Sequence, residues 1–194
     1  MQVLPTRNNN LRMDNTIKGL LKLFHGKRDA LHYYIAGFVD GESSFSVAIL
    51  KNPFKKEGWL INPCFQVYQH KDHREILELC KEVFKTGSIY RKSGTHPVLN
   101  FSINSIRNLK ESVIPFFDRY PLITKRDSYQ KFRDIVLSME RKEHLTSKGF
   151  ERLVRLAYSM NQQGKGRRRT LEEILATQPK PASESSETLR RTHA

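Results

Sequence analysis

Cysteine is scarce in this chain of 194 residues, which contains only Cys64 and Cys80. Both stand among apolar residues, and they do not have the short spacing of a metal-binding pair. The sequence therefore argues against a disulfide framework and against a cysteine-ligated zinc site. We predict that both cysteines are buried free thiols in a reducing compartment.

Long hydrophobic runs are also absent. No apolar stretch approaches the roughly 20 residues that a transmembrane helix needs. The first ten residues, MQVLPTRNNN, lack the apolar segment of a secretory signal. We therefore expect no membrane partner and an intracellular protein.

Acidic residues are few relative to basic ones. The chain has 20 Asp and Glu against 34 Lys and Arg, a net charge of +14, and a pI near 9.9. Hydrophobic residues make up 38%, with eleven Phe and seven Tyr, which is enough for a globular core and too much for a disordered chain. Such an excess of positive charge is typical of proteins that bind a polyanion, most often nucleic acid. A basic surface that is merely solvated is the alternative.

The hydrophobic periodicity predicts secondary structure in the order α-β-β-α-β-β-α-α-α. Four antiparallel strands should form one sheet, with helices on one face and a bare, polar and basic face on the other. The predicted fold class is therefore α+β. The expected elements are a helix over 30–41, strands over 43–51 and 61–69, a helix over 72–84 capped by Asp72, a hairpin over 86–103, a helix over 104–120 that bends near Pro115, a helix capped at Thr124, a long helix beginning near Thr146, and a short helix at 171–175.

Three regions follow from composition. Residues 1–29 should form an N-terminal extension with a short amphipathic helix, and residues 30–176 the globular domain. Residues 177–194 are rich in Pro, Ser, Glu and Thr, and we expect a disordered tail.

The stretch GFVDGE places two acids and two glycines where the first helix should end. Gly37 and Gly41 lie four residues apart on one helix face, and with Ala36 they make a stripe against which another backbone could pack. Glu42 adds negative charge to a helix C-terminus that already exposes unpaired carbonyls, which is unfavourable unless a divalent cation binds there. Two chains packed through the stripe would bring two Glu42 side chains together, as in a paired-metal site for phosphodiester hydrolysis. The alternative is that Asp40 and Glu42 are ordinary surface carboxylates.

YIAGFVDGE resembles the signature motif of the LAGLIDADG homing endonucleases, and the order of the following elements resembles their α-β-β-α-β-β-α core. EVFKTGSIYRKSG and VIPFF are most similar to members encoded by group I introns of large-subunit ribosomal RNA genes. The single motif implies a homodimer. The resemblance further implies that the sheets sit in the major groove of a long pseudo-palindromic DNA site and that cleavage leaves short 3′ overhangs.

The same resemblance implies roles for individual residues. Glu42 corresponds to a ligand of Mg²⁺ (or Mn²⁺), and the carbonyl of Gly41 also reaches the metal. Gln69 corresponds to a residue that orders water, Lys125 to the basic residue of the catalytic pocket, and Asp40 to a mainly structural acid. The motif departs from the family pattern at Glu42, where Asp is commoner, and at Ser43, where Gly is usual. We expect Ala36, Gly37, Asp40 and Gly41 to form the dimer interface.

Outward strand positions are predicted to contact bases, the lysines of the first hairpin loop phosphate or bases, and the later basic run phosphates. Plain solvent exposure of a bare sheet face and a basic linker are the alternatives. Tyr33, Tyr34 and Phe38 are expected in the core, and Trp59 should pack beneath or across the first hairpin. The predicted contacts are Ser44, Ser46, Ala48, Lys51, Lys55, Lys56, Gln66, Tyr68, Tyr90, Lys92, Asn100, Ser102, Lys165, Arg167, Arg168 and Arg169.

Three other functions compete with a DNA endonuclease. A maturase of the same fold would bind intron RNA and assist splicing, and a regulator of the same fold would bind DNA without cutting it. An RNA-binding protein of an unrelated fold would leave Glu42 unexplained. Bacterial cytoplasm, chloroplast and mitochondrion all fit an intron-encoded protein.

Overall fold

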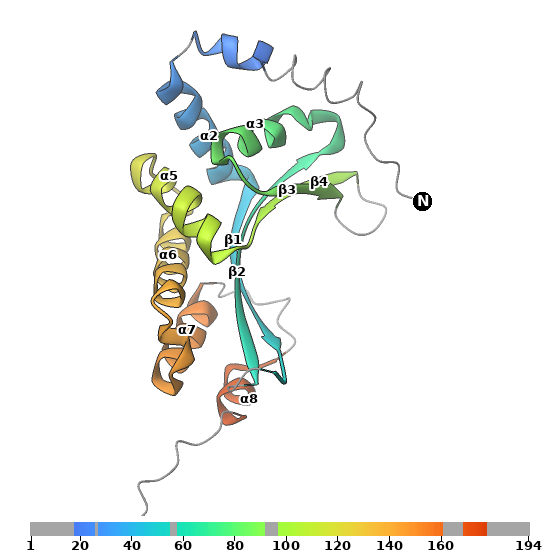
Figure 1. The fold of residues 1–194 in the computed structure, drawn as a ribbon. Coiled ribbons are helices and arrows are strands. Elements are labelled where there is room, and N and C mark those ends of the chain that lie inside the picture. The colour runs from blue at the N-terminus through green and yellow to red at the C-terminus, as the bar shows by residue number, and fades with distance from the viewer. Residues whose placement is uncertain (1–17, 26, 55–57, 92–96, 161–168, 178–194) are drawn as a thin grey trace, which may run out of the picture.

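A single antiparallel sheet organises the chain. The computed structural model describes residues 18–25, 27–54, 58–91, 97–160 and 169–177. The strands are β1 (Ser43–Lys51), β2 (Trp59–His70), β3 (Ser88–Arg91) and β4 (Val98–Ile103), in the order β1-β2-β4-β3. In Figure 1 the β1–β2 pair runs well past β3 and β4 toward α8, and the larger helices lie to one side of the sheet.

The helices confirm the predicted α+β fold and its element order. Neither cysteine forms a disulfide. Within the described ranges, no helix has the length and apolar character to cross a membrane. The helical elements are α2 (Arg28–Glu42), a 3-10 turn (Lys71–His73), α3 (Glu75–Phe84), α4 (Ile106–Asn108), a π-helical segment (Leu109–Val113), α5 (Ile114–Arg119), α6 (Arg126–Glu140), a 3-10 turn (Glu143–Leu145), α7 (Ser147–Ser159) and α8 (Leu171–Ala176).

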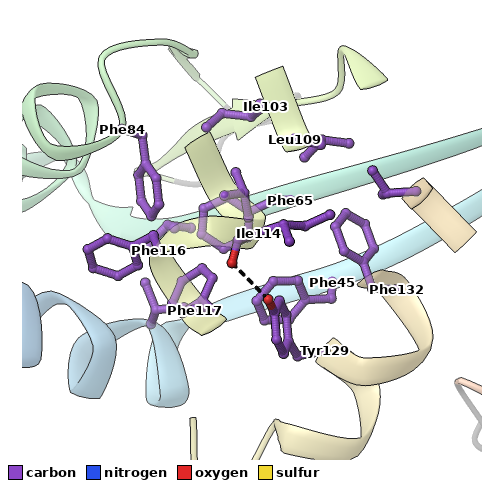
Figure 2. Close-up of a cluster of buried hydrophobic side chains, with 14 of the residues drawn as sticks. Phe45, Phe65, Phe84, Ile103, Leu109, Ile114, Phe116, Phe117, Tyr129 and Phe132 are labelled. Atoms are coloured by element: carbon purple, nitrogen blue, oxygen red, sulfur yellow. Dashed lines mark hydrogen bonds between the residues drawn. The ribbon is translucent and has the colours of Figure 1, made fainter. Parts of the chain in front are cut away.

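Buried and half-buried residues alternate along the strands, and this alternation shows which face of the sheet the helices cover. Along β2, every second residue from Trp59 to Val67 is buried, whereas the residues between them are half-buried. The buried face meets a cluster of aromatic rings in which Phe65 stacks on Phe45 at 5.1 Å and packs edge-on against Phe117 at 5.6 Å (Figure 2). Burying a Phe side chain contributes about 1.5–3 kcal/mol, so this cluster holds the helices on the sheet.

Two predicted helix caps are wrong. Asp72 lies in a 3-10 turn, and α3 begins later, after Arg74, without a side-chain cap. Thr124 does not cap α6, because its side chain donates to the Asp40 carbonyl at 3.1 Å. The bend expected near Pro115 takes the form of the π-helical segment just before α5, which accommodates a proline that cannot donate a backbone hydrogen bond.

The aromatic residues of α2 are only partly in the core. Leu31, Ile35 and Val39 form its buried stripe. Phe38 is half-buried and packs on the core, but Tyr33 and Tyr34 are 60% and 51% exposed, so placing them in the core was wrong. They lie away from the buried stripe, where Tyr33 packs edge-on against Tyr120 at 5.1 Å and Tyr34 packs against Phe24 at 5.6 Å, and much of each ring stays exposed.

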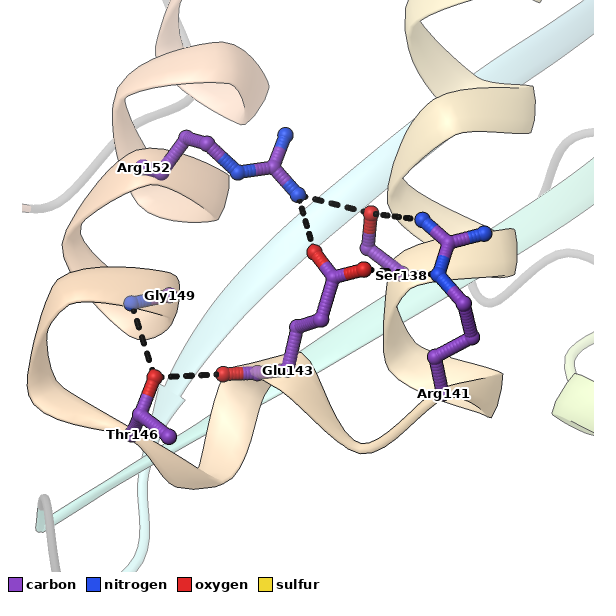
Figure 3. A network of polar contacts seen from close by, with 6 residues as sticks. All are labelled: Ser138, Arg141, Glu143, Thr146, Gly149 and Arg152. Carbon is purple, nitrogen blue, oxygen red and sulfur yellow. Dashed lines mark hydrogen bonds and ion pairs between the residues drawn. The ribbon is translucent and has the colours of Figure 1, made fainter.

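A polar network joins α6 to α7 (Figure 3). Arg152 of α7 donates to Ser138 of α6 at 2.7 Å and to Glu143 of the intervening turn at 2.6 Å. Thr146 accepts from the Gly149 N–H at 3.0 Å and so caps α7, which begins near Thr146 as the sequence predicts. The network fixes α7 against the body of the protein, and α7 in turn packs toward β1 and α8.

Candidate active site and nucleic-acid interface

The C-terminus of α2 and the N-terminus of α6 meet at one point. Asp40 accepts hydrogen bonds from the backbone N–H groups of Ile123 at 3.1 Å, Thr124 at 2.9 Å and Lys125 at 2.9 Å. It therefore supplies acceptors for N–H groups at the start of α6 that have no helical partner. Burial would raise the pKa of Asp40, but the hydrogen bonds from Thr124 and Lys125 outweigh it and hold the pKa below its ordinary value. The structural role expected for Asp40 agrees with this geometry.

Lys125 closes the other side of the junction. Its ammonium group donates to the carbonyls of Val39 at 3.3 Å, of Asp40, and of Gly41 at 2.9 Å. A cation on these carbonyls offsets the negative end of α2. Burial lowers the pKa of Lys125, while the charges of Asp40 and Glu42 act in the opposite direction.

Glu42 stands exposed as the last residue of α2. Its carboxylate forms no hydrogen bond or ion pair with any residue that the structure describes, although its charge acts on Lys125. The carboxylate and the adjoining Gly41 carbonyl are oxygen donors of the kind that Mg²⁺ prefers. The described residues contain no cluster of three or more His, Cys, Asp or Glu that could hold a metal ion. The donor set of one chain fits part of a metal site, and the remaining ligands would have to come from elsewhere.

Gln69 lies at the end of β2 nearest to this junction. Ser43, which follows Glu42, pairs with Val67, so Gln69 is two residues further along and shares the face of Val67. Its Oε1 accepts from the His70 backbone N–H at 2.7 Å. Glu42, Gln69 and Lys125 therefore come from three elements that converge where α2 passes into β1. Their catalytic roles stay predictions.

The second predicted surface is the open face, which we define as the side of the sheet opposite the helices. Ser44, Ser46, Ala48, Gln66 and Ser102 lie on it by alternation and register, and each is half-buried or exposed. The contact of each with DNA stays a prediction.

A hydrogen-bonded group occupies the middle of the open face. Tyr68 OH donates to Gln66 Oε1 at 2.9 Å, and Gln66 Nε2 donates to Tyr90 OH at 3.2 Å. Asn100 Nδ2 also donates to Tyr90 OH, at 2.8 Å. Because Tyr90 accepts both bonds, its own hydroxyl proton can still be donated outward.

Asn100 corrects one prediction. It lies on the open face as expected, but it is only 3% exposed, so it is not an exposed base-reading residue. Its cross-strand neighbours Tyr68 and Tyr90 flank it on both sides and cover it. Asn100 therefore supports Tyr90 from below.

The prediction that both cysteines are buried is wrong for Cys64. Cys80 is fully buried, but Cys64 is half-buried on the open face, where its Sγ lies 3.1 Å from Ser102 Oγ. Burial raises the pKa of both thiols, to about 12 for Cys80. Asn62, Leu60 and Leu50 also lie on this face and were missed, although they have the same parity as Gln66 or Ala48.

The predicted basic contacts divide into two groups. Lys51 is exposed but shares the face of its cross-strand partner Trp59, opposite the open face. The Arg169 guanidinium lies 5.5 Å above the Trp59 ring. Whether either touches phosphate stays a prediction. Lys55, Lys56, Lys92, Lys165, Arg167 and Arg168 lie outside the described residues.

The predicted dimer face is only partly available. Gly37 and Gly41 are exposed, and a Cβ added at either would meet nothing within 4 Å. Ala36 is 4% exposed and packs into the core of its own chain, so it was wrongly placed on this face. The carboxylate of Asp40 is used within its own chain, as described above.

Comparison with known proteins gives consistent matches. The family model for LAGLIDADG endonucleases matches residues 35–136. The chain is 40% identical over 87 residues to DNA endonuclease I-CeuI of Chlamydomonas moewusii, a segment that covers 45% of this chain and 40% of that protein. It is 31% identical over 153 residues to homing endonuclease I-ApeII of Aeropyrum pernix, covering 77% of this chain and 90% of that one.

Solved structures agree in fold. The archaeal intron-encoded homing endonuclease I-Vdi141I, complexed with DNA, superposes with a TM-score of 0.71 at 31% identity, covering 77% of this chain and 94% of that chain. I-SmaMI, bound to an uncleaved DNA target in the presence of calcium ions, superposes with a TM-score of 0.68 at 35% identity. There the match covers 80% of this chain but 53% of the other.

Proposed function

Because the chain belongs to the LAGLIDADG endonuclease family, we propose that it is a site-specific DNA endonuclease that binds a long pseudo-palindromic site as a homodimer. We further propose that it hydrolyses both strands with Mg²⁺ (or Mn²⁺) and leaves short 3′ overhangs. The observation that carries the proposal is the convergence of Glu42, Gln69 and Lys125 beside the open face of a basic protein, with a Glu42 carboxylate that has no partner among the described residues.

Each residue of this site would have a different role in hydrolysis. A divalent ion, when bound, would activate water and stabilise the leaving oxygen. Glu42 and the Gly41 carbonyl would hold that ion, and Gln69 would orient water near the scissile phosphate. Lys125 lies close enough to the junction to supply positive charge to the phosphate.

Two observations support a homodimer. The described part of one chain lacks a complete cluster of metal ligands, so a second copy and the DNA phosphates would have to complete it. The chain also covers nearly all of I-Vdi141I but about half of I-SmaMI, as expected if two copies correspond to the longer protein.

The direct test is cleavage of a DNA library built around intron-less large-subunit ribosomal RNA genes, with Mg²⁺. We expect cutting at one site, with short 3′ overhangs. Tight binding without cutting would favour the DNA-binding regulator. If neither occurs, binding of intron RNA is the next measurement, since it would favour the maturase. The cellular compartment, bacterial cytoplasm or organelle, stays a prediction.

Gly37→Arg should abolish the dimer without harming the fold. The space around Gly37 is empty within one chain, and Arg is a better helix former than Gly by roughly 0.5–1 kcal/mol. We expect sedimentation equilibrium to give a monomer for Gly37→Arg and a dimer for the wild type. Gln130→Arg adds the same charge to an exposed position of α6 and should remain dimeric. A dimeric Gly37→Arg with normal DNA cleavage would contradict this interface.

Cys64 offers a chemical test of the open face. Cognate DNA should slow alkylation of Cys64 by N-ethylmaleimide at least about tenfold, because bound DNA would cover its half-buried thiol. Cys80 is an internal control, since complete burial and a pKa of about 12 should keep it unreactive with or without DNA. Rates can be followed by mass spectrometry of peptides. Equal reactivity of Cys64 in free and DNA-bound protein would exclude DNA binding on this face.

A further inference from the structure

The far end of the β1–β2 pair rests on α8 through Trp59, the only tryptophan of the chain. Trp59 is 6% exposed and lies on the helix side of the sheet. Its Nε1 donates to Thr177 Oγ1 at 2.9 Å, and the Arg169 guanidinium lies over its ring. Arg169 and Thr177 bracket α8, so both ends of this short helix are attached to one indole.

α8 has only six residues, too few for a stable isolated helix. It is held by a capping box between Thr170 and Glu173 and by Ile174, which is 1% exposed. Tyr158 of α7 also donates to the Arg169 carbonyl at 2.9 Å. Because the network of Figure 3 fixes α7 to α6, α8 connects the end of the β1–β2 pair to the body of the protein.

This end of the pair lies far from the candidate active site. Eight residue steps separate Ser43 from Lys51, which corresponds to about 26 Å of strand. At roughly 3.4 Å per base pair, that is about eight base pairs from the cleavage position. β3 pairs only with β4, and β4 pairs with β2 no further than Phe65, so neither supports this end.

At this far end of the β1–β2 pair, the open face becomes apolar. Leu50 and Leu60 are cross-strand partners on it, and Leu50 is 45% exposed. Elsewhere on this face, the side chains around Gln66 are mostly polar. An exposed Leu50 beside a half-buried Leu60 is an apolar surface suited to the 5-methyl group of thymine in the major groove.

We propose that Trp59, Arg169 and α8 are positioning elements that hold Leu50 and Leu60 against thymine methyl groups at the outer end of each DNA half-site. The inference rests on the proposed function. Arg169 then acts through Trp59, without having to contact DNA itself. Loosening α8 should relax sequence preference at the outer positions and leave central positions and the cleavage chemistry unchanged.

The test uses the site recovered from the ribosomal RNA gene library, made as synthetic duplexes with deoxyuridine replacing one thymine at a time. For wild type, losing a contacted methyl group about eight base pairs from the cut should weaken binding about fourfold. Leu50→Ala and Arg169→Gln should each lose this discrimination at the same positions. Arg155→Gln removes an equal charge from α7, where Arg155 pairs with Glu151, and should behave as wild type.

Fluorescence of Trp59 gives a readout that needs no DNA. Arg169→Gln should shift the emission to longer wavelength as the indole becomes hydrated, with little change in melting temperature. Thr177→Val, which removes the acceptor of the indole N–H, should do the same more weakly.

The outcomes separate the two proposals. If wild type neither binds nor cuts DNA, the proposed function fails. If wild type cuts DNA, but removing the methyl group of any outer thymine leaves its affinity unchanged, the inference fails. If Arg169→Gln weakens binding to every duplex equally and keeps the wild-type discrimination at the outer thymines, the inference also fails, because loss of a phosphate contact or general destabilisation would explain that result.

Discussion

Replacing Glu42 by Gln is expected to reduce DNA cleavage by at least about 1,000-fold while DNA affinity stays within about threefold. The carboxylate is exposed at the end of α2 and makes no hydrogen bond or ion pair in the described part of the chain, so its loss should leave the fold intact. A neutral amide of the same size keeps the shape but is a poor ligand for Mg²⁺.

Single-turnover cleavage with Mg²⁺ measures the catalytic loss, and fluorescence anisotropy with Ca²⁺ measures binding. Asp134→Asn is the matched control, because it removes a carboxylate from an exposed position of α6 away from the junction. It should cut as wild type does. Cleavage by Glu42→Gln within about tenfold of wild type would rule out Glu42 as an essential metal ligand.

The sheet could be read from the sequence because its signals are local. β1 begins and ends at the predicted residues, Ser43 and Lys51, since the larger apolar residues Phe45, Val47 and Ile49 recur at every second position after a glycine-containing helix end. The same alternation separated the covered face from the open face. The position of Glu42 at a helix terminus followed from the chain alone.

Features that depend on distant residues were not predictable in this way. Asp40 provides the acceptors for α6 from more than 80 residues away, which made Thr124 look like the cap. Asn100 is buried by tyrosines on neighbouring strands. Arg169 belongs to a basic run in sequence, but it packs on an indole 110 positions earlier.

Tyr33 and Tyr34 show a different limit. Their aromatic character suggested a core position, yet they lie on the side of α2 that also exposes Gly37. A hydrophobic residue in a sequence is expected to be buried, but the sequence does not say whether its own chain or a second chain buries it. Under the proposed homodimer, a second copy would cover this side of the helix, so the same signal would be satisfied between chains.

Asp40→Asn should destabilise the protein by roughly 2–4 kcal/mol at pH 7, because charge-assisted hydrogen bonds to the start of α6 are lost. The effect should also reach the active site, since the same interaction places Lys125 against α2. Urea unfolding followed by circular dichroism measures the loss, with Asp134→Asn as the control that should change stability by less than about 0.5 kcal/mol.

The pH dependence of this loss identifies its cause. Hydrogen bonds from Thr124 and Lys125 depress the pKa of Asp40 in the folded state, so its stabilisation is present above the unfolded pKa of about 3.9. It is lost as the pH falls through the lower, folded pKa. The difference between wild type and Asp40→Asn should therefore be constant from pH 7 to about pH 5 and shrink in stronger acid. A difference that persists undiminished below pH 3 would mean that packing at the α2–α6 junction, and not the charge of Asp40, carries the stability.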